Sequence, residues 1–143
     1  MREEKLSLYE IFGLLNKPQR RRPVYLEDKL QTGCRYWFDA QYPQYRILLH
    51  HSPNEGLLVK SSRDGAKRKA MGVRAGFPDF IFLLPNKEYP YLAIELKTEK
   101  GRQSDSQKEY QKAVESVGGK YVIVRSIEEF IREINSYINS VLK

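Results

Sequence analysis

The sequence predicts an α/β fold in which helices flank a mixed sheet of about four strands. Three observations lead to this prediction. Short apolar runs of strand length lie at residues 79–84, 91–97 and 121–124. Longer stretches repeat apolar residues every three or four positions, as amphipathic helices do, and they lie at residues 23–40, 104–117 and 127–141. A short turn between two strands indicates an antiparallel pair, whereas a strand–helix–strand step indicates a parallel crossover.

The first half of the chain is expected to be mainly helical. Residues 3–15 carry Leu8, Ile11, Phe12 and Leu15 at helical spacing. Pro23 opens a second helix, which runs to about residue 40. A short strand is predicted over residues 46–50, and a basic helix over residues 64–71 that ends at Gly72.

The second half alternates strands and helices. A turn at residues 85–87 joins the first two apolar strands, and a loop at 98–103 leads into the helix over 104–117. The strand at 121–124 has no polar residue, so we expect burial on both of its faces. Ser126 and Glu129 have the spacing of a capping box and mark the start of the last helix.

Length and composition describe one globular domain. The chain has 143 residues, of which 41% are hydrophobic and 30% charged, a balance that excludes a disordered low-complexity chain. The single cysteine, Cys34, cannot form an internal disulfide and is expected in the core, which favours a reducing, cytoplasmic setting. The apolar runs are far shorter than the ~20 residues of a membrane span, and no signal peptide is visible.

The net charge of +7 is concentrated in two segments. Residues 17–22 hold Lys17, Arg20, Arg21 and Arg22 without an acid, and residues 60–74 hold six basic residues against Asp64 alone. A concentrated basic surface attracts a polyanion and releases its counterions. A solvated helix face would explain one such run, but two runs favour nucleic acid as the partner. A membrane surface fits less well, because the amphipathic stretches have mixed charges on their polar faces.

Three charged residues of the two apolar strands are expected to converge. Side chains alternate along a strand, so Leu92, Ile94 and Leu96 face the core while Glu95 and Lys97 emerge on the opposite face. Asp79 stands at the start of the preceding strand. In an antiparallel pair the start of one strand lies beside the end of the other. Asp79 should therefore lie beside Glu95 and Lys97.

This group of side chains is suited to phosphodiester hydrolysis. Two carboxylates without histidine or thiolate ligands favour a hard divalent ion, Mg²⁺ first and Mn²⁺ second. Such an ion lowers the pKa of bound water and polarises a phosphoryl oxygen, and a neighbouring ammonium can orient the attacking water. Each half alone has a simpler interpretation, a surface ion pair at a strand end or a turn at Pro-Asp. Their combination on adjacent strands favours a catalytic site.

The motifs resemble those of a known nuclease group. The matching segments are GVRAGFPD at 72–79, IELKT at 94–98 and KGRQS at 100–104, followed by Gln107, with Pro53-Asn54 as an additional loop match. Over residues 26–134 the chain resembles the PD-(D/E)XK nuclease superfamily and, within it, the virus-type replication-repair nuclease (VRR-NUC) family. The resemblance implies a restriction-endonuclease-like core over residues 23–143, preceded by a helix and basic linker over 1–22, in a single domain over 1–143.

The same resemblance assigns roles to six residues. It implies that Asp79, Glu95, Lys97 and Gln107 are catalytic, and that Asp79, Glu95, the main-chain carbonyl of Leu96 and Glu27 hold the metal ion.

Other roles are open for some of these residues. Gln107 follows Ser104 by three positions and could serve only as its capping-box partner, although the cap and the site role can coexist. Glu27 could instead be a boundary residue that pairs with a lysine. His50 and His51 point to opposite faces of a strand, so they cannot chelate one ion together, and a structural or DNA-contacting role is favoured.

The resemblance implies a Mg²⁺-dependent endonuclease that acts on DNA and needs no small-molecule cofactor. Stand-alone members of the family resemble Holliday-junction resolvases, form homodimers and often come from phages, which implies the cytoplasm of a bacterial or phage-infected cell. Resolving a four-way junction requires two symmetric nicks, which a two-fold dimer can supply. The stripe over residues 3–15 could help to form that dimer or could cover its own core. Phosphate contacts are expected from Arg20, Arg21, Arg22, Arg63, Lys67, Arg68, Lys69, Arg74, Lys100 and Arg102.

Two other functions remain open from the sequence. One is a non-catalytic nucleic-acid-binding protein built on a nuclease scaffold, against which the intact set of Asp79, Glu95, Lys97 and Gln107 argues. The other is a nuclease for a flap, a plain duplex or RNA.

Overall fold

The computed structural model of the protein describes residues 26–52 and 61–141. Several sequence predictions lie outside these residues. They are the helix over 3–15, the start of the second helix at Pro23, the basic residues Arg20, Arg21 and Arg22, and the Pro53-Asn54 loop.

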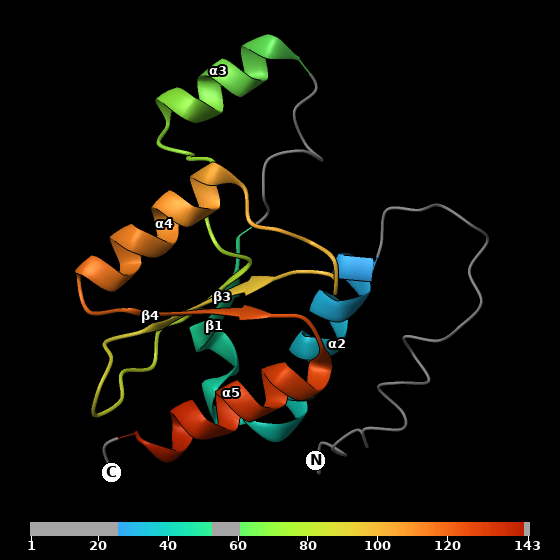
Figure 1. The fold of residues 1–143 in the computed structure, drawn as a ribbon, viewed down its shortest axis with the longest axis vertical. Helices are drawn as coiled ribbons and strands as arrows, with labels where there is room; N and C mark the ends of the chain where they lie inside the picture. The colour runs from blue at the N-terminus through green and yellow to red at the C-terminus, as the bar shows by residue number, and fades with distance from the viewer. Residues whose placement is uncertain (1–25, 53–60, 142–143) are drawn as a thin grey trace, which may run out of the picture.

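A four-stranded mixed sheet forms the centre of the fold, as the sequence predicts (Figure 1). Its strands are β1 (Leu49–His51), β2 (Phe80–Phe82), β3 (Leu92–Leu96) and β4 (Lys120–Val124), in that spatial order. The first two pairs are antiparallel, and β3 and β4 are parallel. The helix between β3 and β4 makes the parallel crossover. Phe80 lies opposite Ile94, which brings the start of β2 beside the end of β3.

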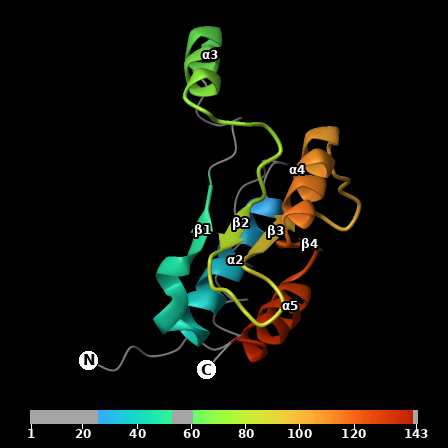
Figure 2. The ribbon, with the colours of Figure 1, turned by 90° about the vertical axis from the view of Figure 1, so that its left-hand side faces the viewer.

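Helices cover both faces of the sheet (Figure 1). On one face lie α2 (Leu26–Gln41) and α5 (Ile127–Asn139), whose buried residues join those of the strands in the main core. On the other face lies α4 (Asp105–Ser116), which contributes Val114 to a smaller cluster. The basic helix α3 (Ser62–Ala70) projects from the body of the molecule beyond α4, as Figures 1 and 2 show.

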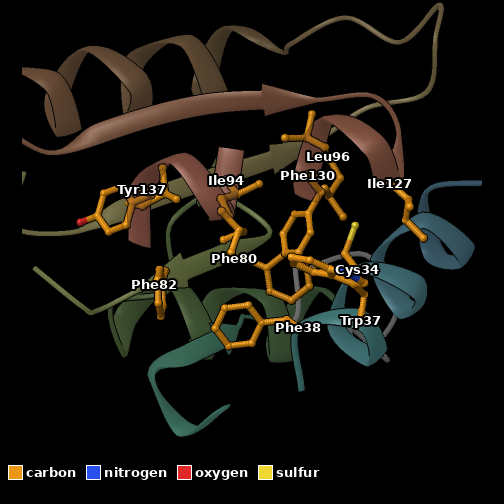
Figure 3. Packing of buried hydrophobic residues seen from close by; sticks show 13 residues of the cluster. Cys34, Trp37, Phe38, Phe80, Phe82, Ile94, Leu96, Ile127, Phe130 and Tyr137 are labelled. Atoms are coloured by element: carbon orange, nitrogen blue, oxygen red, sulfur yellow. The ribbon is translucent and has the colours of Figure 1, made fainter. Parts of the chain in front are cut away.

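The main core is dominated by aromatic rings from both layers (Figure 3). Phe38 of α2 meets Phe82 of β2 edge-to-face, with ring centroids 5.2 Å apart. Trp37 of α2 meets Phe130 of α5 in the same way at 6.0 Å. Such arrangements are the favoured geometry of buried aromatic pairs. Cys34 is completely buried among them, as expected.

The strand predicted over residues 46–50 exists, but its bounds are wrong. Residues Pro43–Leu48 form a 3₁₀ helix (η1), and β1 begins only at Leu49. Proline fixes φ near its helical value, which favours a turn at this position. The Tyr45 amide donates to the Tyr42 carbonyl at 2.9 Å, and the two tyrosine rings stack. Aromatic packing next to the core therefore decides the local conformation.

Two further strand predictions need correction. The strand expected over 79–84 contains only Phe80–Phe82, and Asp79 precedes it. The strand expected to be buried on both faces, now β4, is an edge strand in which Val122 and Ile123 are only partly buried. The strand with every residue buried is β3, because β2 and β4 flank it and helices cover both of its faces.

The helix boundaries agree closely with the sequence. Gly72, which follows α3, has a positive φ of 99°, a conformation that glycine adopts without strain. The capping box expected for α5 forms only in part. The Glu129 amide donates to the Ser126 hydroxyl at 3.1 Å, but the Glu129 carboxylate accepts from the Arg125 amide instead of the Ser126 amide.

In the part of the chain that the structure describes, no helix is long and apolar enough to cross a membrane.

Candidate active site

Glu95 and Lys97 lie at the end of β3 on the face covered by α4. Both are buried, with exposed fractions of 1% and 9%. The Lys97 Nζ lies 2.9 Å from the Glu95 Oε1. Leu92, Ile94 and Leu96 point the other way, into the main core, so the expected alternation is confirmed.

Asp79 joins this pair through the backbone of β3. Its Oδ2 accepts a hydrogen bond from the Leu96 amide at 2.7 Å. Its own carbonyl is 2.8 Å from the Nδ1 of His51, a contact in which the ring nitrogen must be the donor because a carbonyl only accepts. The antiparallel register thus brings Asp79 to Glu95 and Lys97, as the sequence predicts.

Gln107 contacts both the start of α4 and Glu95, so its geometry is compatible with both roles that the sequence leaves open. Its Oε1 accepts from the backbone amide of Ser104 at 2.9 Å, and its backbone amide donates to the Ser104 hydroxyl at 3.2 Å. These two bonds complete a capping box at the start of α4. Its Nε2 donates to the Glu95 Oε1. The oxygen of the side-chain amide therefore caps the helix, and the nitrogen of the same amide contacts the carboxylate.

A glycine contact joins the segment before Asp79 to the start of α4. Gly76 has a φ of +84°. A Cβ at this position would lie 2.4 Å from the carbonyl carbon of Ser106 and 2.7 Å from the amide nitrogen of Gln107. No other residue type fits here without moving one backbone away from the other. The absence of a side chain at Gly76 therefore allows the segment before Asp79 to lie directly against the start of α4.

Glu27 lies near the site, at the first turn of α2. Its Oε1 accepts from the Thr98 amide at 3.3 Å, directly after Lys97 in the chain. Its negative charge helps to raise the pKa of Asp79. Within residues 26–52 and 61–141, however, no three His, Cys, Asp or Glu side chains gather around one point. The contact that the structure shows for Glu27 is with a loop amide, and among the described residues no lysine forms an ion pair with it.

Both central carboxylates resist ionisation. Burial and, second, the nearby charge of Asp79 raise the pKa of Glu95 to about 7, against the lowering effects of Lys97 and of the Tyr121 hydrogen bond. Burial also raises the pKa of Asp79, against the lowering effects of the Leu96 amide and the Lys97 charge. Two desolvated carboxylates that repel each other form an electrostatic environment in which an additional cation is stabilised.

Sequence reasoning missed Tyr121 of β4. This side chain is buried, and its hydroxyl donates to the Glu95 Oε2 at a long 3.4 Å. Tyr121 lies opposite Ala93 in the parallel register, which places it on the face of Glu95. The sequence contains ten tyrosines, and only the register of β3 and β4 distinguishes this one.

The basic residues expected to contact DNA lie in two places. Arg63, Lys67 and Lys69 are exposed on α3, whereas Arg68 of the same helix is half-buried. Lys69 and the exposed Arg74 also line a hollow of about 750 Å³ between α3 and α4, together with Tyr110. Lys100 and Arg102 are exposed on the loop that follows Lys97.

Comparisons with known proteins agree on one family. The family model described as "VRR-NUC domain" matches residues 25–128. A solved structure described as "VRR_NUC domain protein" is similar to this chain, with a TM-score of 0.70 and 30% sequence identity over 80% of this chain and 89% of the other. None of the curated proteins matches the chain.

Proposed function

Because this chain belongs to the VRR-NUC family, whose domain has a nuclease-type fold, we propose that it is a metal-dependent endonuclease that hydrolyses phosphodiester bonds in DNA. The observation that carries this proposal is the meeting of Asp79, Glu95 and Lys97 at the end of β3. A purely structural ion pair would not need a second desolvated carboxylate beside it, because that carboxylate repels the first.

The side chains present fit a magnesium ion. Mg²⁺ binds oxygen ligands, is often held by only one or two carboxylates and keeps several water molecules. Asp79 and Glu95 supply two such carboxylates. The Leu96 amide faces Asp79, and in a strand the amide and carbonyl of one residue point to the same side, so the Leu96 carbonyl is expected to be a third ligand. Mn²⁺ should substitute, because it accepts the same donors. When bound, such an ion supplies Lewis acidity and a water of lowered pKa.

The remaining residues orient the two carboxylates and neutralise negative charge on the phosphoryl group. The Lys97 ammonium is buried, so its charge is poorly screened and can stabilise the negative charge that develops on the phosphoryl group. It can also hold the attacking water by a hydrogen bond. Gln107 fixes the orientation of Glu95, and the Leu96 amide fixes that of Asp79. Each reacting group is therefore held by a second contact.

We extend the proposal to the substrate. Exposed basic side chains on α3 and on the loop after Lys97 would bind phosphates without reading bases, which suits recognition by DNA shape. One chain carries one catalytic set, whereas a four-way junction needs two symmetric nicks. A two-fold homodimer acting on four-way junctions meets both requirements.

A cleavage assay tests this function. A synthetic four-way junction and a linear duplex of matching sequence are incubated with the protein in Mg²⁺, Mn²⁺ or EDTA and analysed on a denaturing gel, with Asp79→Asn as the inactive control. Paired symmetric nicks in the junction alone, absent in EDTA and in the variant, are expected. Cleavage of both substrates would indicate a general nuclease. A junction that is retarded but uncut in both metals would indicate a binding protein.

The role of α3 has its own test. Replacing Lys67, Arg68 and Lys69 together by alanine should weaken junction binding and lower the slope of log affinity against log salt by ~0.9 for each phosphate that is no longer neutralised. A triple alanine variant of the exposed Lys87, Lys112 and Arg132 serves as a charge-matched control. An equal change in slope for both triple variants would exclude α3 as a specific DNA contact.

A further inference from the structure

Arg125 makes an unusual set of contacts directly after β4. Its Nη1 donates to the carbonyl of Thr98 at 2.6 Å, of Gly101 at 2.7 Å and of Glu99 at 3.3 Å. All three acceptors are main-chain oxygens of the loop that follows Lys97. Hydrogen bonds from a charged guanidinium are stronger than those between neutral groups. Through these contacts Arg125 therefore holds the backbone of this loop and does not neutralise an acid.

Arg125 is itself fixed by the start of α5. Its amide donates to the Glu129 Oε2 at 2.7 Å, and the Glu129 amide is bound to the Ser126 hydroxyl. One residue earlier, the Val124 carbonyl accepts from the Lys97 amide at 2.9 Å. The guanidinium thus extends from a rigid junction between β4 and α5 that lies beside the end of β3.

The loop that Arg125 holds touches the candidate active site at two points. A Cβ on Gly101 would lie 3.3 Å from the Lys97 Cδ, so the loop backbone packs directly against the stem of the lysine. The Thr98 amide donates to Glu27. A lysine stem has four rotatable bonds, so packing along it restricts where the ammonium can lie.

We propose that Arg125 is a positioning residue that holds loop 98–101 against Lys97 and thereby keeps the ammonium at Glu95. The same contacts fix the loop that presents Lys100 and Arg102 to DNA. This inference rests on the proposed nuclease function for its catalytic consequence, although the holding of the loop can be measured without activity. A displacement of about 1 Å in a catalytic group can lower a rate by as much as ~10²-fold.

The test uses the full-length protein and compares Arg125→Ala and Arg125→Lys with Arg132→Ala, which removes an exposed arginine of α5. In Arg125→Ala the amides of Thr98 and Gly101 should exchange with solvent faster, while the amides of β3 remain protected. For cleavage, kcat should fall by ~10–100-fold with KM changed by less than about threefold. Millimolar guanidinium, far below denaturing concentrations, should restore part of the activity. Arg125→Lys should restore little, because an ammonium lacks the planar set of donors.

Three outcomes would overturn the inference. The first is that the loop amides exchange as in the unmodified protein, and the second is that kcat stays within twofold of the unmodified protein's value. The third is a loss of activity accompanied by faster exchange throughout β3, which would indicate a general structural role. If Arg125→Ala does not fold, Arg125→Lys supplies the same two measurements. An unmodified protein that cuts no DNA would overturn the proposed function, whereas the exchange data would still decide whether Arg125 holds the loop.

Discussion

The two faces of the sheet bury different kinds of side chain. The face covered by α2 and α5 is packed with large apolar and aromatic side chains from both helices and from the strands (Figure 3). On the face covered by α4 the buried apolar cluster is small, consisting of Ala93, Val114 and Tyr121, and the charged residues Glu95 and Lys97 are buried on the same face. One face therefore supplies most of the apolar core, and the other holds the charged residues to which we assign the proposed chemistry.

The two faces meet in the backbone of β3. The Leu96 side chain is buried in the main core, while its amide holds the Asp79 carboxylate. The core therefore fixes the backbone on which the charged groups stand. Burial on the apolar face offsets the unfavourable desolvation of two carboxylates and an ammonium, so the sheet can keep them close together. Variants that change one face only can test this division.

The largest effect is expected from Lys97→Met, which keeps the apolar stem and removes the charge. Cleavage should fall by about 10³-fold, equivalent to ~4 kcal/mol in the activation free energy. The junction dissociation constant and the thermal unfolding midpoint should change little, because the main core is untouched. Single-turnover cleavage and gel retardation measure the two quantities. Loss of folding in this variant would show that Lys97 is structural and that the two faces are not separable.

The converse variant, Phe130→Ala, changes only the apolar face. Phe130 is fully buried and contacts Trp37 and Phe80. The free energy of unfolding should fall by ~3–5 kcal/mol, because apolar surface is no longer buried and a cavity is left behind. At a temperature where the variant is folded, kcat should stay within a few-fold of its original value.

Urea unfolding measures the loss of stability, and Ile134→Val provides a milder variant with an expected loss of ~0.5–1.5 kcal/mol. A large drop in kcat for folded Ile134→Val would show that the core controls the chemistry directly.

The charged face was the more predictable of the two from the sequence. Alternation along a strand placed Glu95 and Lys97 together, and antiparallel pairing placed Asp79 beside them. These inferences need only the period of a strand and the direction of its neighbour. The Ser104–Gln107 cap was equally readable, because capping depends on residues three positions apart.

Contacts that depend on tertiary packing were not readable. Tyr121 reaches Glu95 only because β4 pairs in parallel with β3 in one particular register. Arg125 binds three main-chain carbonyls. Every residue has such a carbonyl, so the sequence does not indicate which ones lie near Arg125. The strand predicted over residues 46–50 overlaps the end of the 3₁₀ helix at Pro43–Leu48, because tyrosine packing, which involves distant residues, overrides the local pattern.

A smaller effect is expected from pH, through the Glu95 pKa of about 7. The pKa lies above the ordinary value of 4.5, so the folded state binds this proton more tightly than the unfolded state. In EDTA, the stability that the proton confers is complete below the ordinary value and is lost as the pH rises through about 7. Mg²⁺ needs the ionised carboxylate, so its apparent affinity should fall by up to about tenfold per pH unit below this pKa.

Thermal unfolding with and without Mg²⁺, at several values between about pH 5 and pH 8, measures both trends. Glu95→Gln cannot titrate and should lose the pH dependence attributed to this carboxyl. If the variant retains the whole dependence, the proton is bound elsewhere.

The smallest effect is expected from Tyr121→Phe, which removes one hydroxyl from the charged face. The hydrogen bond to Glu95 is long, at 3.4 Å, so its removal should change kcat by less than about tenfold, in keeping with the ~1 kcal/mol of an ordinary hydrogen bond. The Tyr121 hydrogen bond lowers the pKa of Glu95, so in Tyr121→Phe this pKa should rise and the acid limb of the pH–rate profile should move to higher pH.

Tyr110→Phe is the matched control, because Tyr110 packs against Phe77 beside the same small apolar cluster. Its pH profile should not move. A fall of more than about 100-fold in Tyr121→Phe would exceed what one long hydrogen bond can supply, and would mean that the hydroxyl acts in the reaction itself. A profile that does not move would instead mean that Tyr121 only packs on Ala93. The apolar cluster on this face would then be a small core in its own right, and the division between the two faces would be one of degree.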